Sequence, residues 1–466
     1  MTTLLFCAAC ADDGAGDAAD EVGSESADST SDSGTSSTDE SSSDGSSSTD
    51  DSSSSTDTGE QPLPAAGLFI SAADLERARD RAGGSVDLFT TQADLVAGRA
   101  DSALSLTPDP FHMDDISQIR FGWCEGTDDV DDTLREATSK FESESDPMRT
   151  LALQYALTGD AQYGDKSVAL MLAWAGEQTI VNLHELGVDY QAGSLDGMTA
   201  DYCSDRPWNF ALDAMWQTYG LINVADAYLL LTRNGYALDP ADDAALRDWI
   251  LRLAEAVNSS FNAWTKWADA HPNSGSYERY RADNHLSWCL AGLIAAAAAL
   301  EDEQLAAYVL EGGSWTDSYE GAYANPSSIR SVIDWAIEPD GRIYEEKILR
   351  DPPIGYSFFH LWAMMLVARV AEVHFETGAP GLWEYPGDDG GDMEIAYDRY
   401  AGFVLGSKVS PEPDQEGDLA GNQWLYEAAV SRWGKAEHRE VIDFGERNTW
   451  INQSIGAVPL LIGVDP

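Results

Sequence analysis

Apolar residues return at every third or fourth position along most of the chain, from about residue 68 onward. This spacing matches the period of an α-helix, whereas a half-buried strand would alternate every second residue. Clear alternation of that kind is absent from the sequence. The pattern predicts an all-α fold whose main helical stretches are residues 146–175, 208–231, 240–261, 284–313 and 352–376.

The breaks in this pattern predict antiparallel pairs of helices. Ser71 precedes the first apolar-periodic stretch and suits a helix N-cap. Gly159, in the sequence "TGD", divides residues 146–175 into two helices, because glycine readily adopts the left-handed conformation that ends a helix. Hairpins of this kind recur without a strict sequence period, which is typical of an α-solenoid or of a closed α/α toroid.

The N-terminal region has a different composition. Residues 11–63 are rich in Ser, Asp and Gly, and residues 1–60 contain 15 acidic side chains but no Lys or Arg. Such a segment buries too little apolar surface to offset its chain entropy, so we predict a disordered linker there. We expect one folded domain at residues 64–466.

The first ten residues, "MTTLLFCAAC", resemble the end of a bacterial lipoprotein signal. Cys10 follows two small residues and precedes the acidic linker, an arrangement typical of a lipid-anchored protein on a cell surface. We therefore expect an exported protein, either an outer-membrane or cell-surface lipoprotein or an extracellular one, with its true start upstream. Any membrane contact is expected only through a lipid anchor at Cys10.

Charge and cysteine content narrow the possible classes. The formal net charge is −54, and residues 61–466 alone carry −39. A nucleic-acid-binding protein needs clustered basic residues to neutralise phosphates, so this class is excluded. In an exported protein the three remaining cysteines allow one disulfide and one free thiol; Cys124 with Cys203 is one possible pairing, and Cys289 is the third residue.

Aromatic residues are numerous near the expected helix ends. The chain has 15 Trp and 18 Tyr, and several lie in "FGWCEG", "NAWTKWADAHP" and "GGSWTDSYEGAY". Sugar rings stack on aromatic faces, so this distribution favours a cleft that binds a carbohydrate.

One ordered set of motifs resembles a known enzyme group. "NHLSW" opens a long apolar stretch, and "DGRIYEEKILRDPPIGY" follows it further along the chain. Over most of residues 65–400 the chain resembles the helical-toroid polysaccharide lyases, and in particular the alginate lyases of families 5 and 38. The resemblance implies an α/α toroid of about six to seven helical hairpins, closed or incomplete, and a lyase domain at residues 64–466. The matching positions are Asn284, His285, Trp288, Asp340, Gly341, Arg350 and Tyr356.

Two departures from the family 5 motif bear on whether the chain resembles family 5 or family 38 more. Family 5 usually has a second Asn where this chain has Asp283, and its Arg-to-Tyr spacing is typically one residue longer. Both departures favour the family 38 type. Which uronic acid is the substrate therefore stays open between mannuronate, guluronate and glucuronate.

The residue types also suit the chemistry of β-elimination. Cleavage of a 4-linked uronic acid requires removal of the C5 proton, stabilisation of the substrate carboxylate and protonation of the leaving O4. Asn284 can donate an amide hydrogen to that carboxylate, and His285 can act as the base. An unperturbed tyrosine has a pKa of about 10, so Tyr356 needs a nearby cation to act as acid or base, and Arg350 is the candidate.

Further residues are candidates for substrate binding. We expect Arg279, Arg281, Arg342, Lys347 and Arg350 to line one positive cleft that offsets the acidic exterior. Glu278 and Asn209 are candidates for contacts with the substrate carboxylate. The complete predicted substrate-binding set is Asn209, Glu278, Tyr280, Arg281, Trp288 and Arg342.

Each catalytic candidate also has a structural interpretation. His285 could be an ordinary buried histidine, Tyr356 a helix-start aromatic, and Arg350 the i, i+4 ion-pair partner of Glu346. His360 shares a predicted helix face with Tyr356 and is expected to pack behind it. The remaining histidines, which include His112, His184, His271, His374 and His438, form no zinc motif, so neither a metal nor a cofactor is expected.

Two other function classes remain possible. A glycoside hydrolase on the same scaffold would need two opposed carboxylates, and a non-catalytic glycan-binding lipoprotein would use only the aromatic residues. The leading hypothesis is a lyase that acts as a monomer on an acidic polysaccharide.

Overall fold

The computed structural model describes residues 64–114, 133–185, 215–270, 279–317, 321–324, 327–375, 381–445 and 447–466. Only the backbone is described at residues 264, 266–270, 279, 280, 317 and 321–324. The elements are α1 (Ala72–Ala82), α2 (Asp87–Ala103), α4 (Thr133–Thr158), α5 (Ala161–Glu177), α7 (Gln217–Thr232), α8 (Pro240–Ala270), α9 (Arg279–Ala282), α10 (Asn284–Leu300), α11 (Glu303–Glu311), β1 (Ser314–Asp317), β2 (Gly321–Ala324), α12 (Ile329–Ala336), α13 (Tyr344–Lys347), α14 (Pro353–His374), η3 (Leu382–Glu384), α15 (Met393–Val404), η4 (Leu419–Asn422), α16 (Leu425–Trp433), α17 (Ala436–Asp443) and α18 (Val458–Leu461).

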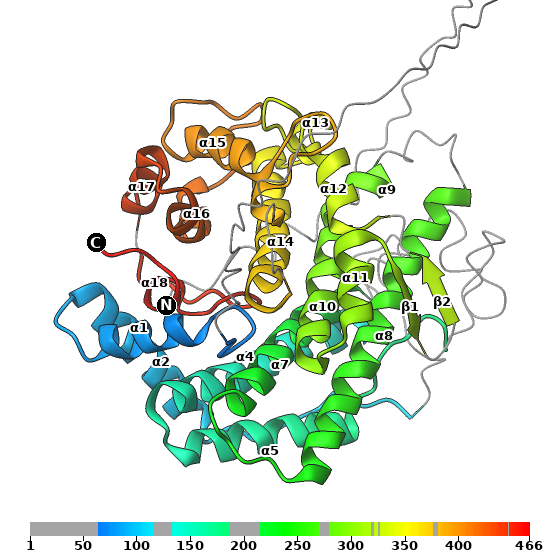
Figure 1. The fold of residues 1–466 in the computed structure, drawn as a ribbon, viewed down its shortest axis with the longest axis vertical. Coiled ribbons are helices and arrows are strands. Elements are labelled where there is room, and N and C mark those ends of the chain that lie inside the picture. Colours follow the sequence, from blue (N-terminus) through cyan, green and yellow to red (C-terminus); the bar gives the residue numbers. More distant parts are fainter. Residues whose placement is uncertain are drawn as a thin grey trace, which may run out of the picture. The chain divides into compact units, whose positions relative to one another are not determined.

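The helices lie in two layers, as an α/α toroid requires. Four helices form an inner row in which each packs on the next: α4 on α7, α7 on α10, and α10 on α14. Outer helices cover this row, with α2 and α5 against α4, α8 against α7 and α10, and α11 against α10. Figure 1 shows α10 and α14 side by side within this arrangement. The predicted all-α toroid is confirmed.

Three helices of the inner row, α7, α10 and α14, are largely buried on every side. Almost every residue of α7 and α10 is buried, as expected for a helix with no polar face. The 22-residue α14 has a mean hydropathy of 1.3 in its most apolar window, long and apolar enough to cross a membrane by composition alone. However, 78% of that window is buried inside the protein, so α14 is a core helix here.

Local sequence signals place several helix ends as predicted. Ser71 caps α1 through a capping box, in which its hydroxyl accepts from the Asp74 N–H and the Asp74 carboxylate accepts from the Ser71 N–H. Gly159 separates α4 from α5 with a φ of +74°. The predicted helix at residues 240–261 is longer in the structure, where α8 continues to Ala270.

A short hairpin is the main departure from the predicted secondary structure. Strands β1 and β2 pair antiparallel, with Trp315 opposite Tyr323. The aromatic segment around β1 was expected to contribute to a sugar-binding surface. Trp315 is instead 3% exposed, and its indole N–H donates to Asp302 at 3.2 Å, so it belongs to the core.

One end of the inner row gathers the segments that carry the predicted motifs. Figure 1 shows α9, α12 and α13 at the same end of α10 and α14. Helix α9 packs on α10 and α12, and α13 packs on α14.

Cys289 is buried on α10, and burial raises the pKa of its thiol well above the usual value. The residues Cys10, Cys124, Cys203, Asn209, His271 and Glu278 lie outside the described residues.

Candidate active site

The first turn of α10 carries the centre of the site. Asp283 is the N-cap residue, and its Oδ1 accepts the backbone N–H of His285 at 2.9 Å. The same Oδ1 contacts Nδ1 of the His285 imidazole. The cap therefore determines where the imidazole lies as well as where the helix begins.

Arg350 connects this turn with α14. Its Nη1 lies 3.5 Å from Oδ2 of Asp283, and its guanidinium carbon lies 4.0 Å from the ring centroid of Tyr356. Arg350 and Tyr356 are thus in contact, with the cation over the ring face, a favourable arrangement. Arg350 does not pair with Glu346, which instead binds Arg399 at 2.8 Å and Tyr400 at 2.9 Å.

The backbone around Arg350 is held in an uncommon conformation. Leu349 has a φ of +54°, in the left-handed region that ends many helices. The Arg350 N–H donates to the carbonyl of Glu345 at 2.9 Å, which closes the end of α13. This reversal directs the chain from α13 back toward the start of α14.

A carboxylate from a distant segment holds the first turn of α14. Glu416 accepts the backbone N–H groups of Ile354 and Gly355, both at 2.7 Å. Those groups have no partner within the helix, and a negative charge is favourable at a helix N-terminus. Glu416 therefore stabilises the turn from which Tyr356 extends.

A second buried carboxylate lies behind the imidazole. Oε1 of Glu345 accepts from the backbone N of Asn284 at 2.9 Å and from its Nδ2 at 3.0 Å, while Oε2 lies 2.9 Å from Nδ1 of His360. One of the two amide hydrogens of Asn284 is thus already used within the protein. Its carbonyl Oδ1 is buried without a hydrogen-bond partner among the described residues. His360 has the packing position that the sequence predicts.

Exposure separates the groups that can meet a substrate from those behind them. His285, Tyr356 and Arg350 retain 3%, 5% and 8% of their surface, whereas Asn284 and Trp288 retain none. The contact between Asn284 and the substrate carboxylate stays a prediction, since Asn284 is fully buried in the structure. As the first residue of α10 it has an N–H group with no partner within the helix, and Glu345 binds both this group and the side chain.

The predicted sugar contact at Trp288 needs correction. Its ring packs against Tyr219 at 4.9 Å, Phe359 at 4.9 Å and Trp362 at 5.1 Å between centroids. Because α10 is buried on every side, a residue one turn after His285 points into the core. The aromatic residue beside the imidazole is Trp216, which precedes α7 and lies 6.1 Å from the His285 ring.

The predicted positive cleft is also only partly supported. Arg342 and Lys347 both pair with Glu338, at 3.2 and 3.6 Å, so their charges are offset on the protein itself. Nη1 of Arg281 on α9 lies 3.3 Å from the Ser327 hydroxyl oxygen. The side chains of Arg279 and Tyr280 are outside the described part of the structure.

The "DG" of the motif has a structural explanation. Gly341 has a φ of +80°, and a Cβ there would lie 2.4 Å from the carbonyl oxygen of Ile395. Asp340 accepts the Arg342 N–H at 3.1 Å, which stabilises the same turn. This pair therefore shapes the loop before α13 rather than supplying chemistry.

Sequence reasoning did not assign roles to Asp283, Glu345 and Trp216. An acidic residue directly before "NH" is a recognisable N-cap signal, which made Asp283 accessible in principle. Glu345 reaches Asn284 across 61 residues of sequence, and no local pattern indicates such a contact.

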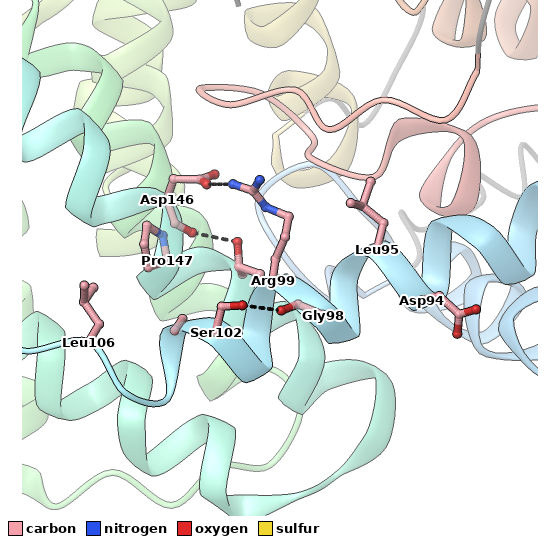
Figure 2. A pocket seen from close by; sticks show the side chains of 10 residues that line it. Asp94, Leu95, Gly98, Arg99, Ser102, Leu106, Asp146 and Pro147 are labelled. Atoms are coloured by element: carbon pink, nitrogen blue, oxygen red, sulfur yellow. Dashed lines mark hydrogen bonds and ion pairs between the residues drawn. The ribbon is translucent and has the colours of Figure 1, made fainter. Parts of the chain in front are cut away.

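Other features of the described structure lie away from this cluster. A cavity of about 520 Å³ lies between α2 and α4, where Arg99 of α2 faces Asp146 of α4 (Figure 2). Within the described residues no group of three or more His, Cys, Asp or Glu side chains could hold a metal ion.

Comparisons with known proteins define the class. The model of the alginate lyase family matches residues 107–409. An alginate lyase from Bacteroides ovatus aligns with a TM-score of 0.57 and 16% identity, over 86% of this chain and 99% of its own. Alginate lyase A1-III from Sphingomonas species A1 aligns with a TM-score of 0.53 and 14% identity, over 87% and 97%. A search of curated proteins finds no match.

The chain belongs to the alginate lyase family. It is an enzyme of the polysaccharide lyase class, with the α/α toroid that its structural neighbours share.

Proposed function

We propose that the protein cleaves a 4-linked polyuronate by β-elimination, and that this substrate is alginate, in particular its polymannuronate, or glucuronan. The observation that carries the proposal is the contact set of His285, Asp283, Arg350 and Tyr356, where the first turns of α10 and α14 meet. His285 supplies a base, Arg350 a cation and Tyr356 a hydroxyl group, the groups that β-elimination of a uronate requires.

The bond changes of the reaction assign a task to each group. A base takes the C5 proton, the electron pair forms the C4=C5 bond, the C4–O4 bond breaks, and O4 receives a proton. His285 and Tyr356 are the candidate base and acid. Arg350 stabilises the charge that develops on the substrate carboxylate. Asn284 can add its second amide hydrogen only after the groups around it rearrange, because it is fully buried.

Complexes of a structural neighbour support the choice of His285 and Tyr356. Alginate lyase A1-III has been solved with a tetrasaccharide in one variant with a histidine replaced by alanine and in another with a tyrosine replaced by phenylalanine. These variants align with the present chain at TM-scores of 0.52 and 0.53 and at 16% and 15% identity. The same two residue types meet here through Asp283 and Arg350.

The arrangement of carboxylates does not favour a glycosidase. Hydrolysis needs two carboxyl groups that face one glycosidic bond from opposite sides. Among the described residues, Asp283 and Glu345 are the carboxylates that bind His285 and the adjacent Asn284, and they are 1% and 0% exposed. Asp283 is bound to His285 and Arg350, and Glu345 to Asn284 and His360. Neither is placed to meet a sugar directly.

One assay tests the activity and the substrate together. The protein is incubated with mannuronan, guluronan and glucuronan in parallel, and ultraviolet absorbance and reducing ends are followed. A lyase produces the conjugated C4=C5 alkene, which absorbs, together with reducing ends. Reducing ends without absorbance would indicate a hydrolase, and neither signal on any substrate would contradict the proposal.

A pair of histidine variants then tests the assignment of the base. His285→Ala should lower alkene formation most on the linkage whose C5 proton faces the imidazole. His112→Ala is the control, since the His112 side chain is 62% exposed and its contacts in the described structure are with Asp114 and with the carbonyl oxygen of Glu177, both away from the cluster. Equal activity of the two variants on every substrate would remove His285 from the reaction.

A further inference from the structure

The Asp283 carboxylate makes more contacts than a helix cap requires. Oδ1 binds the backbone N–H of His285 and the imidazole Nδ1, and Oδ2 lies 3.5 Å from Nη1 of Arg350. The side chain is only 1% exposed. A single buried carboxylate thus joins the start of α10, the imidazole and the guanidinium over Tyr356.

Other caps of the chain show what capping alone needs. Asp160 caps α5 by accepting the Gln162 N–H at 3.1 Å, and Asp392 caps α15 by accepting the Ile395 N–H at 2.8 Å. A serine or asparagine would cap these helices about as well. A buried charge is costly unless it is paired, so a carboxylate at position 283 is explained by its two side-chain partners and not by the helix.

Geometry at the imidazole limits which nitrogen can react. A carboxylate has no hydrogen to donate, so the close approach of Asp283 Oδ1 to His285 Nδ1 is favourable with a hydrogen on Nδ1 and repulsive with a lone pair there. Nε2 then carries the lone pair in the neutral imidazole. The ring is held from a second side by Trp216, whose centroid lies 6.1 Å away at an interplanar angle of 69°.

We propose that Asp283 is a positioning residue for the lyase reaction: it keeps the His285 proton on Nδ1, so that Nε2 is the reacting nitrogen, and it holds Arg350 over Tyr356. This inference rests on the proposed function. The Asp283 carboxylate orients two groups of the site at once, because His285 on α10 contacts its Oδ1 and Arg350, next to α14, lies beside its Oδ2. Asp283 itself does not touch the substrate.

Replacement by asparagine changes the hydrogen-bond pattern with little change in shape. The atom at the Oδ1 position meets both the backbone N–H and Nδ1 of His285. An asparagine whose carbonyl oxygen lies there keeps the cap, but its amide group then faces Arg350, which is itself a donor. An asparagine whose amide group lies there donates to Nδ1 and moves the imidazole proton to Nε2, but gives up the cap. Both orientations lose the charge that holds Arg350. We expect Asp283→Asn to lower kcat on the order of 10²–10⁴-fold, the contribution of a positioned general base, with KM changed less than about threefold.

The experiment compares Asp283→Asn with Asp160→Asn in the full chain. Asp160→Asn makes the same replacement at an exposed cap and should leave kcat unchanged. The second readout is the ¹⁵N spectrum of the labelled imidazoles, with His285 assigned from His285→Ala. The His285 proton should lie on Nδ1 in the parent and in Asp160→Asn, and at least partly on Nε2 in Asp283→Asn.

Two results would overturn the proposal. One is an Asp283→Asn protein with parental kcat, and the other is a loss of kcat with the imidazole proton still wholly on Nδ1. If Asp283→Asn does not fold, Asp283→Ser retains a capping oxygen and should show the same loss of kcat. If the parent forms no alkene from any polyuronate, the proposed function fails, while the ¹⁵N spectrum still tests the contact with Asp283.

Discussion

The cluster around His285 and a second cluster around Arg149 are made of similar parts. In the first, Arg350 binds Asp283 and lies over the ring of Tyr356. In the second, Arg149 binds Asp146 at 2.9 Å and lies 5.1 Å from the ring centroid of Trp450. Both clusters are buried, and both join segments that are far apart in the sequence.

The partners of the second cluster show that it is structural. Arg149 donates to the carbonyl oxygens of Ile451 and Ser454, which belong to the C-terminal segment. The Trp450 indole N–H donates to Asp146 at 2.9 Å, and Arg99 contacts the same carboxylate beside the cavity shown in Figure 2. The cations and the indole are therefore used to fasten the chain end onto α4.

The two clusters differ in the side chains that surround the arginine. Around Arg149 the donors bind backbone carbonyls and carboxylates of the protein, and Arg149 is 1% exposed. Around Arg350 lie an imidazole and a phenol, which retain 3% and 5% of their surface. A buried ion pair with a cation over an aromatic ring is thus not a sign of catalysis by itself. The signal is the presence of groups that can exchange protons with a bound molecule.

The largest expected effect tests this distinction at Tyr356. Tyr356→Phe keeps the ring under Arg350 but removes the hydroxyl. If Tyr356 moves a proton in the reaction, kcat for alkene formation should fall at least about 10³-fold, while substrate binding changes little. Trp450→Phe changes the matching aromatic residue of the structural cluster and should keep the parental kcat. Near-normal alkene formation by Tyr356→Phe would make the two clusters equivalent.

The next effect concerns stability and appears at Arg149. Arg149→Met removes a buried cation and leaves the Asp146 carboxylate without it, which should lower the free energy of unfolding by about 3–5 kcal/mol. Denaturant titration measures this loss, and kcat per folded molecule should stay at the parental value. If Arg149→Met does not fold, Arg149→Lys should show a smaller loss with the same kcat. A large fall in kcat with unchanged stability would assign Arg149 to the reaction.

A smaller effect is a dependence of stability on pH. Burial, with the Asp146 carboxylate as second cause, raises the pKa of Glu142 to about 7 from its ordinary 4.5. Because the folded protein holds this proton more tightly than the unfolded chain, the free energy of unfolding should fall as pH rises from about 4.5 to 7. Glu142→Gln removes this titration and should raise stability at pH 8 by about 1–3 kcal/mol.

Thermal unfolding across that pH range measures the effect. Glu136→Gln, at an exposed position on the same helix, is the matched control and should keep the parental pH slope. A Glu142→Gln protein with the parental slope would show that Glu142 does not titrate in this range. The pKa of Asp226, which burial raises to about 6, contributes a slope of the same sign that both variants retain.

The smallest expected effect is at the backbone before Arg350. Leu349 has a φ of +54° and Glu301, at the far end of α10, has a φ of +57°. Glycine adopts this conformation without strain, so Leu349→Gly and Glu301→Gly should each raise the free energy of unfolding by about 0.5–1 kcal/mol. Both should keep the parental kcat. A loss of kcat only in Leu349→Gly would show that the leucine side chain itself orients Arg350.

The sequence predicts the features of this protein that depend on near neighbours. Apolar residues at every third or fourth position indicate α4, α5, α10, α11 and α14, because a helix buries the face that recurs once per turn. The capping box at Ser71 and the break at Gly159 likewise depend only on adjacent residues. The order of "NH", Arg350 and Tyr356 was enough to predict the family and three of the residues that now form one cluster.

Only the tertiary structure decides which polar groups meet. Asp283 and Arg350 are 67 residues apart, and Asn284 and Glu345 are 61 apart, so their contacts exist because α10, α13 and α14 pack together at one end. The same packing surrounds α10 on every side and places Trp288 in the core, although its sequence context suggests a sugar contact. Helical periodicity states which face of a helix is buried, whereas the partner of that face depends on the path of the whole chain.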